Sequence, residues 1–440
     1  MERQIRNYSH YAEIEKVMRI LITAEFYEPY KCGITEVTKQ LAERWVEHGH
    51  TVTVATSFLP YRTFENLNGV HIEQFHITGN RALGISGTQD EIKRYQDFLC
   101  RDWDIVLQNA AQEWTVDAAF DVLPRMRAKK VLIPCGYSGL RQSLYAGYYQ
   151  GYIAHMPLFI RMYERLKNFA KAIMHTLRGS RMRKPDYTAY YQELPRFLKQ
   201  YDSLVYMSPS YQDKLFGDEH GVGDKAMIIP NGADEREFCV VDERDARHEL
   251  GITTPHIVIT VANHYIAKRH DFVIRAFERM RRTDTTLLII GTIPSVGLKY
   301  IGHMMLGCYP YCKFSSMVNK NIRLVNGSDR GLIVSAYKQA DAFLFGSYIE
   351  YAPLVMYESF ASHAPFITRN VGNVSGHAEF LKIVKTPEEM AAMANNFLNH
   401  PHERAVFADS AFHFWLKHHT WAHIAKQYEE LFGELLDRRR

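Results

Sequence analysis

The sequence predicts an α/β protein of two Rossmann-like, doubly wound domains that face a central cleft. Two series of short apolar runs, each typical of a buried parallel strand, alternate with stretches of helical spacing. A turn-rich loop at 230–234 separates the two series and is the expected interdomain linker. With 440 residues, the chain is long enough for two or three hydrophobic cores.

The first series starts at 18–24, after a mostly polar leader of residues 1–17. A helix through Val37, Leu41 and Trp45 then leads to a strand at 52–55, which completes one βαβ unit. Further buried strands are expected at 105–107, 131–133, 204–206 and 227–229. Together these elements predict an N-terminal domain at 18–237, which includes a basic, aromatic segment at 158–184.

The second series starts with a strand at 257–261, followed by a helix whose apolar positions include Phe272 and Phe277. Further strands are expected at 287–291, 322–325, 342–345 and 365–367. The alternation repeats that of the first series, so it predicts a C-terminal Rossmann-like domain at 238–415. The last segment, 416–440, is expected to form a helix that returns to the N-terminal domain.

Two glutamates, Glu350 and Glu358, are the sharpest chemical signal in the sequence. Pro353 suits the first turn of a helix, so Glu350 would precede that helix and Glu358 would lie on it. The backbone N–H groups of Leu354 and Val355 would then be free to bind a diphosphate. Glu358 would accept hydrogen bonds from ribose hydroxyls, and Glu350 from sugar hydroxyls. Taken alone, two glutamates at this spacing favour an ordinary solvent-facing pair.

The segment 347–372 resembles the Glu-x7-Glu block of retaining glycosyltransferases with the GT-B architecture, family four, also called glycosyl transferases group 1. The resemblance runs from Met18 to about Phe432, and in the family the first glutamate contacts the donor sugar and the second the nucleotide ribose. Supporting matches are the hinge 229–234 with Phe238, Lys268 followed by 271–277, Ala340-Asp341, and Trp421. The resemblance implies that the N-terminal domain binds the acceptor and the C-terminal domain binds a nucleoside diphosphate sugar.

Lys268 also has a physical rationale of its own. Departure of a nucleoside diphosphate leaves negative charge on phosphate oxygens, and a fixed ammonium group nearby stabilises that charge as it develops. The alternative is a solvated loop lysine. Lys268 and Glu350 are therefore the predicted catalytic residues. The predicted donor-binding residues are Glu358, Leu354, Val355, Asn263, Gly33 and Asn326.

The chain departs from the family pattern at several of these positions. Asn263 stands where the family usually has an arginine, and Asn109 and Cys135 stand where histidines are common. The residue before Gly33 is a cysteine, where the family usually has a second glycine. Gly33 would let the backbone approach the donor phosphate or the acceptor. Recognition of the base is expected from backbone atoms near Asn326.

No metal site is predicted from the sequence. The Asp102-Trp103-Asp104 signature precedes a strand, whereas a metal-binding pair should follow one. Cys308 and Cys312 lack a second pair at zinc spacing, even with His303 nearby. The six cysteines are scattered and form no disulfide framework, which favours a reducing compartment.

The formal net charge of +4, from 53 basic and 49 acidic residues, does not favour nucleic acid as a partner. Neither a signal peptide nor a membrane span is expected, so the predicted location is the cytoplasm. The basic segment 158–184 has two interpretations that remain open. It is either a surface held against anionic lipid at the inner membrane face, where a polyprenyl-linked acceptor would reside, or a helical insertion packed on the N-terminal domain.

The predicted function is transfer of a hexose-type sugar from a nucleoside diphosphate sugar to a hydroxyl acceptor with retained anomeric configuration. No cofactor is expected beside the nucleoside diphosphate sugar, which is a co-substrate. The product would be a polysaccharide, glycolipid or other glycoconjugate. Two alternatives remain: a nucleotide-sugar epimerase of the same architecture, and a catalytically silent sugar-nucleotide-binding or scaffold protein. Asn263, Asn109 and Cys135 keep the second alternative open.

Overall fold

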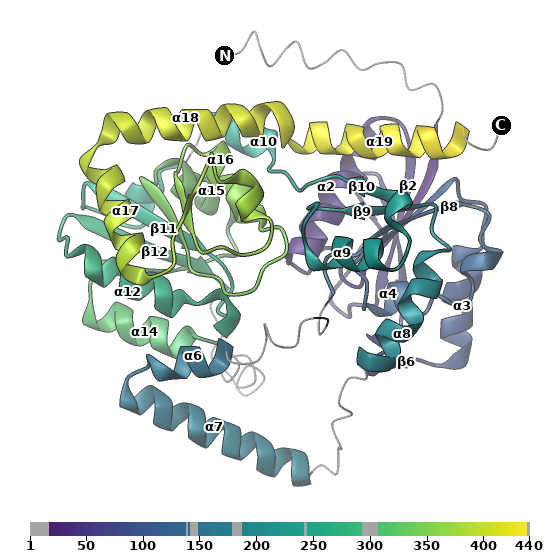
Figure 1. Cartoon of the computed structure of the whole chain (residues 1–440), viewed down its shortest axis with the longest axis horizontal. Coiled ribbons are helices and arrows are strands. Elements are labelled where there is room, and N and C mark those ends of the chain that lie inside the picture. The colour runs from purple at the N-terminus through teal and green to yellow at the C-terminus, as the bar shows by residue number, and fades with distance from the viewer. Residues whose placement is uncertain are drawn as a thin grey trace. The chain divides into compact units, whose positions relative to one another are not determined.

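The computed structural model describes residues 17–137, 140, 148–177, 187–241, 244–292 and 307–437 (Figure 1). The predicted leader therefore lies outside the described residues, except for Val17. The chain forms two compact units. The N-terminal unit comprises Met1–Tyr137, Pro185–Ile229 and Ile424–Arg440, and the C-terminal unit comprises Ser138–Lys184 and Pro230–His423.

The N-terminal unit contains an eight-stranded sheet in the order β10-β9-β8-β7-β1-β2-β4-β3. All neighbouring strands are parallel except β3 and β4. The predicted apolar runs form β1, β2, β7, β8, β9 and β10, of which β10 is an edge strand, and the order is that of a doubly wound sheet. The strands are β1 (Arg19–Thr23), β2 (Thr51–Ser57), β3 (Asn66–Leu67), β4 (Val70–Phe75), β7 (Ile105–Asn109), β8 (Lys129–Ile133), β9 (Ser203–Tyr206) and β10 (Ala226–Ile228); β5 (Thr78–Asn80) and β6 (Gly84–Ser86) form a separate hairpin.

Helices connect the strands of this unit, and within the described residues the last helix packs against the first. The indole N–H of Trp45, on α2, donates to the carbonyl oxygen of Ala425 at 3.2 Å. The same ring contacts Tyr428 and Phe432 edge-on. The helices are α2 (Gly33–Glu47), α3 (Gln89–Leu99), α4 (Trp114–Asp117), η2 (Leu123–Arg125), α8 (Tyr187–Leu198), α9 (Gln212–Glu219), η3 (Gly223–Lys225) and α19 (Trp421–Asp437), the last of which starts in the C-terminal unit.

The C-terminal unit contains a fully parallel six-stranded sheet in the order β13-β12-β11-β14-β15-β16. Numbered within the unit, this is the Rossmann order 3-2-1-4-5-6. Successive residues of its central strands enter two different hydrophobic clusters: Val258 and Ile289 belong to one, and Ile259 and Ile290 to the other. Both faces of the sheet are therefore buried, which explains why the strands are continuous apolar runs. The strands are β11 (His256–Val261), β12 (Thr285–Gly291), β13 (Ile322–Asn326), β14 (Ala342–Phe345), β15 (Phe366–Thr368) and β16 (Lys382–Ile383).

The segment 138–184 groups with the C-terminal unit and not, as the sequence analysis expected, with the N-terminal domain. Tyr152, Met156 and Ile160 enter the same hydrophobic cluster as Phe272. This apolar stripe gives α6 and the start of α7 their packing partner. The helices of the unit are α6 (Tyr148–Ala154), α7 (Leu158–Leu177), α10 (Glu235–Phe238), α11 (Ala246–Glu249), η4 (Ile266–Lys268), α12 (His270–Met280), α14 (Tyr309–Val318), α15 (Arg330–Lys338), α16 (Leu354–Ala361), η6 (Val374–His377), α17 (Pro387–Asn399) and α18 (Pro401–His418).

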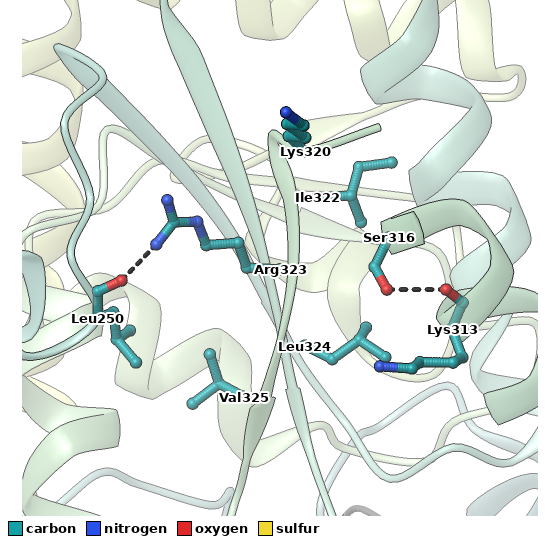
Figure 2. Close-up of a pocket in the computed structure, with 8 residues that line it drawn as sticks. All are labelled: Leu250, Lys313, Ser316, Lys320, Ile322, Arg323, Leu324 and Val325. Atoms are coloured by element: carbon teal, nitrogen blue, oxygen red, sulfur yellow. Dashed lines mark hydrogen bonds between the residues drawn. The ribbon is translucent and has the colours of Figure 1, made fainter. Parts of the chain in front are cut away.

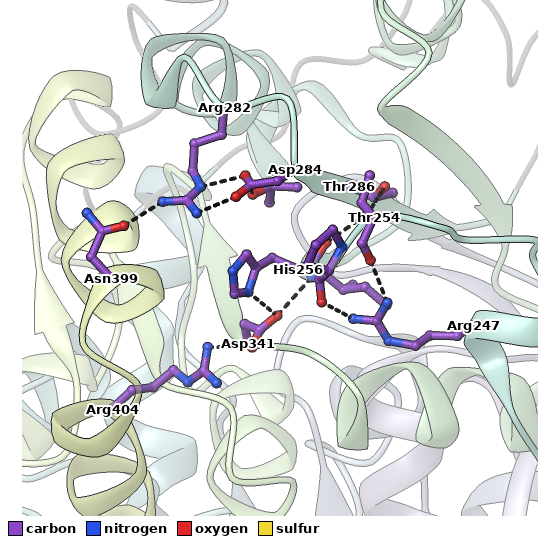
Figure 3. A network of polar contacts seen from close by, with 12 residues as sticks. Arg247, Thr254, His256, Arg282, Asp284, Thr286, Asp341, Asn399 and Arg404 are labelled. Carbon is purple, nitrogen blue, oxygen red and sulfur yellow. Dashed lines mark hydrogen bonds and ion pairs between the residues drawn. The ribbon is translucent and has the colours of Figure 1, made fainter.

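A polar network links the amino-terminal ends of the strands in the C-terminal unit (Figure 3). Asp341 immediately precedes β14, accepts from the backbone N–H of Ile257 at 2.9 Å and pairs with Arg404. Arg282 forms a bidentate pair with Asp284, at 2.8 and 2.7 Å, just before β12. These charges lie at the strand ends opposite to those that carry ligands in such sheets, so we assign them to stability.

Among the described residues, no helix combines the length and the apolar character that crossing a bilayer requires.

Candidate functional site

The carboxyl ends of β11, β12 and β13 approach one another closely. A Cβ atom on Gly291 would lie 2.2 Å from the carbonyl oxygen of Ala262, so glycine is required at this position. Asn263 lies at the same edge, where its side-chain oxygen accepts from the backbone N–H of Thr292 at 3.2 Å. Asn326 is the exposed last residue of β13 and pairs in register with Gly291. Two of the predicted donor-binding residues therefore share one edge of the sheet.

Lys268 and Glu350 meet at the point where the strand order reverses, between β11 and β14. The Lys268 Nζ lies 2.6 Å from the Glu350 Oε1, and the two side chains are 29% and 11% exposed. The Ser347 hydroxyl donates to the same carboxylate oxygen at 2.6 Å. The backbone N–H of Tyr348 donates to the carbonyl of Ala267 at 2.8 Å, which joins the two loops. The loops after β11 and β14 thus hold both predicted catalytic residues in contact at a place where α/β sheets bind ligands.

Arg269 does not supply a charge toward this edge. Its backbone has a φ of 51°, in the left-handed region that favours glycine. Its buried guanidinium forms a bidentate pair with buried Asp271, at 2.8 and 2.9 Å. We infer that this pair offsets the backbone strain.

Glu358 is buried, which excludes the alternative that the two glutamates form an ordinary solvent-facing pair. Its Oε2 accepts from the Tyr337 hydroxyl at 2.8 Å, and its Oε1 lies 2.7 Å from Arg330 Nη2. Burial raises the pKa of Tyr337 well above its ordinary value, so the phenol keeps its proton and donates. An ionised carboxylate has about four lone-pair sites, so Glu358 retains capacity to accept from a ligand.

The helix between the two glutamates starts one residue later than Pro353 suggested. Pro353 is the residue before α16, and Leu354 and Val355 are its first two residues. Backbone N–H groups at these positions have no acceptor within the helix. Gly372 packs against the loop before the helix, where a Cβ would lie 2.3 Å from the carbonyl oxygen of Tyr351.

The remaining predicted residue, Gly33, belongs to the N-terminal unit and is the first residue of α2. In the same unit, the Asn109 amide donates to Thr38 Oγ1 at 3.0 Å and accepts from the Cys135 thiol at 3.3 Å. The two positions at which the family often has histidine are thus bonded to each other. Cys135 has a φ of 57°.

A carboxylate pair in the N-terminal unit escaped the sequence analysis. Glu25 follows β1 and Glu113 follows β7, and these neighbouring strands flank the point where that sheet reverses order. The backbone N–H of Glu25 donates to the Glu113 Oε2 at 3.0 Å. Burial raises the pKa of Glu113 to about 8 and that of Glu25 to about 7. The available signal was an acidic residue shortly after each of two predicted buried strands.

A pocket beside the edge strand β13 contains none of the predicted site residues (Figure 2). It is lined by Leu250, Lys313, Ser316, Lys320, Ile322, Arg323, Leu324 and Val325.

Comparison with known proteins places this site in a family context. Residues 242–414 match the model of a family described as glycosyl transferases group 1. This range contains both glutamates and Lys268, so the resemblance identified from their motif is confirmed. No curated protein sequence matches the chain.

Solved structures match nearly the whole chain. Sucrose-phosphate synthase from Thermosynechococcus elongatus has a TM-score of 0.68 at 15% identity, covering 96% of this chain and 100% of that one. A glycosyltransferase from Rickettsia africae has a TM-score of 0.68 at 14% identity, with 96% and 99% covered. Anabaena HepE in complex with UDP-glucose has a TM-score of 0.65 at 12% identity, with 95% and 100% covered. At these identities the likeness establishes the fold, and it confirms the predicted GT-B architecture of two Rossmann-like domains.

Proposed function

We propose that this chain, whose residues 242–414 match glycosyl transferases group 1, transfers a hexose from a nucleoside diphosphate sugar to a hydroxyl acceptor with retention of configuration. The observation that carries the proposal is the Lys268–Glu350 contact of 2.6 Å at the switch point of a Rossmann sheet. A lysine and a carboxylate fixed at this point, beside a helix N-terminus, suit a ligand that combines a sugar with a diphosphate.

Each residue has a distinct role in the proposed reaction. The Lys268 ammonium and the first N–H groups of α16 bind the diphosphate, while Glu350 accepts from sugar hydroxyls and Glu358 from the ribose. The bond from the anomeric carbon to the phosphate oxygen breaks as the acceptor oxygen bonds to the same face of that carbon. The acceptor proton passes to the departing phosphate oxygen, so retention requires no protein nucleophile. Lys268 stabilises the charge that this phosphate gains.

We place the product among polysaccharides, glycolipids or other glycoconjugates, and the enzyme at the cytoplasmic face of an anionic membrane. The support is α7, whose exposed large apolar side chains recur at helical spacing beside the exposed cations Arg161 and Arg165. These side chains are Leu158, Phe159, Met162, Leu166, Phe169 and Ile173, between 43% and 66% exposed. The predicted cations at 178–184 lie outside the described residues.

Vesicle sedimentation tests the membrane proposal. Full-length protein should bind vesicles that contain anionic lipid, and binding should fall with salt. Leu166→Glu combined with Phe169→Glu should abolish it, whereas Val406→Glu, at an exposed apolar position on α18, serves as the control. Equal binding to neutral vesicles, or none to either kind, would remove the membrane from the proposal.

A thermal-shift screen against uridine, guanosine and adenosine diphosphate sugars tests the donor proposal. A ligand that binds the folded chain raises its midpoint by mass action, and a hundredfold excess over Kd adds about 2.7 kcal/mol. We expect one base to be favoured and the shift to shrink in Glu358→Gln. A chain whose midpoint no nucleotide sugar changes would contradict the proposed donor site.

The catalytically silent alternative keeps one specific observation in its favour. Asn109 and Cys135 stand where the family often has histidines, and the Cys135 thiol donates to the Asn109 side-chain oxygen at 3.3 Å. A silent protein would bind the donor but would not release its diphosphate, and this difference separates the two functions.

A further inference from the structure

Four buried side chains that can bind metal meet beside the Lys268 loop. They are His264, His270, Cys308 and Cys312, and their exposed fractions are 6%, 0%, 0% and 0%. One ligand atom from each lies within 4.8 Å of those from the other three. Their arrangement within the described residues depends on neither Lys268 nor Glu350, so it is an observation separate from the donor site.

The local fold brings the four together from two segments. His264 follows β11 and His270 opens α12, and η4 with Lys268 lies between them. Cys308 immediately precedes the first residue of α14, and Cys312 lies one turn later, on the same face. The backbone N–H of Cys308 donates to the carbonyl of His264 at 2.8 Å, which pins the two segments. The cysteine spacing alone could not reveal this set, because its histidines come from a separate part of the sequence.

The distances within the cluster suit a tetrahedral ion. The Cys308 Sγ lies 3.2 Å from His270 Nδ1 and 4.0 Å from His264 Nδ1. A tetrahedral zinc with bonds of about 2.3 Å to sulfur and about 2.0 Å to nitrogen separates these atom types by about 3.5 Å. The two measured separations bracket that value, so small side-chain adjustments would seat the ion.

The cluster is poorly explained as ordinary packing. The Nδ1 atoms of His264 and His270 both face the Cys308 sulfur, which is only a weak hydrogen-bond partner for a buried imidazole. Cys308 and Cys312 are free thiols and not a disulfide. Two thiols and two imidazoles in a buried position form a soft donor set, which selects zinc over magnesium or calcium.

We propose that His264, His270, Cys308 and Cys312 bind one structural Zn²⁺ ion. Two neutral imidazoles and two thiolates fill its four positions, and both thiol protons leave to solvent on binding. A closed set of four protein ligands leaves no position for a substrate, so the ion acts on structure and not on the chemical step. It holds both ends of the 264–270 loop and thereby positions Lys268. This inference revises the expectation from sequence that the chain has no metal site.

Metal content tests the proposal directly on the full-length protein purified without chelators. Elemental analysis should find about one zinc per chain, and Cys308→Ser or Cys312→Ser should lose it. Cys239→Ser, which changes a half-buried free cysteine of the same unit, should retain it. Cobalt introduced in place of zinc should give the intense visible bands of a tetrahedral site and a thiolate-to-cobalt charge-transfer band in the ultraviolet.

The cobalt spectrum of the unmutated chain keeps the test decisive if the serine variants fail to fold. A chain that folds with less than about 0.1 equivalent of metal, even after incubation with zinc, would overturn the proposal. Bound cobalt without the charge-transfer band would also overturn it, because that metal would be held by surface histidines. Neither readout depends on sugar transfer, so the zinc site and the proposed function can fail separately.

Discussion

Lys268→Ala removes the cation that the proposed mechanism places beside the departing phosphate. The Lys268 ammonium lies 2.6 Å from Glu350. Ser347 also donates to that carboxylate at 2.6 Å, so Glu350 keeps this hydrogen bond after the substitution. We therefore expect the variant to fold, with its thermal midpoint within a few degrees of the original.

The size of the kinetic effect follows from charge and distance. An ammonium about 4 Å from a phosphate oxygen contributes about 4 kcal/mol at an effective dielectric constant of about 20. The Lys268 side chain is 29% exposed, and solvent screening reduces this figure. Loss of about 3 to 4 kcal/mol corresponds to a fall in turnover of about 10²- to 10³-fold, the range seen when one preorganised stabiliser is removed.

The assay is release of nucleoside diphosphate at saturating donor, with Lys268→Ala compared to Lys320→Ala. Lys320 is an exposed lysine in the pocket beside β13, so its removal changes the net charge equally without touching the site. Donor affinity should change less than turnover, because the charge on the phosphate grows as it departs. Unchanged turnover in Lys268→Ala, with the true donor at saturation, would refute the assignment.

Three further substitutions test the other parts of the account. Glu358→Gln should weaken donor binding about 10- to 100-fold with little change in turnover, since a hydrogen bond to a charged group contributes about 1.5 to 3 kcal/mol. Isothermal titration calorimetry measures the donor affinity, and an unchanged affinity would exclude ribose binding by Glu358. Gly291→Ala should weaken donor binding too, because its Cβ would lie 2.2 Å from the Ala262 carbonyl, and a variant that binds normally would contradict a site at this edge. Glu113 has a pKa raised to about 8 by burial, so the stability linked to its protonation is complete below its ordinary pKa of 4.5 and is lost as the pH rises through about 8. Glu113→Gln should therefore flatten the decline of the thermal midpoint between about pH 5 and pH 9. An unchanged pH profile would contradict the inference that the Glu113 carboxyl group is protonated in the folded chain.

The fold was predictable because the chain's buried strands are continuous apolar runs. Ile259 and Ile290 face one cluster while Val258 and Ile289 face the other, and only a sheet covered on both sides needs such runs. The positions of Glu350 before a helix and of Glu358 on it were also predictable, because Pro353 between them favours a helix N-terminus.

The rest of the site depends on contacts between distant segments. Tyr337 and Arg330 hold Glu358 from another helix, and no local pattern marks them as its partners. The segment 138–184 was placed in the wrong unit, because an apolar stripe shows that a helix packs but not against which sheet.

Hydrolysis of a panel of nucleoside diphosphate sugars, measured without acceptor, tests the central claim most directly. A transferase activates its donor for departure, so water should slowly replace the acceptor with one member of the panel. We predict release of free sugar and nucleoside diphosphate from that donor, at a rate that falls about a hundredfold or more in Lys268→Ala. Binding of a nucleotide sugar with no release of diphosphate from any member would contradict the account and identify the chain as a silent binding protein.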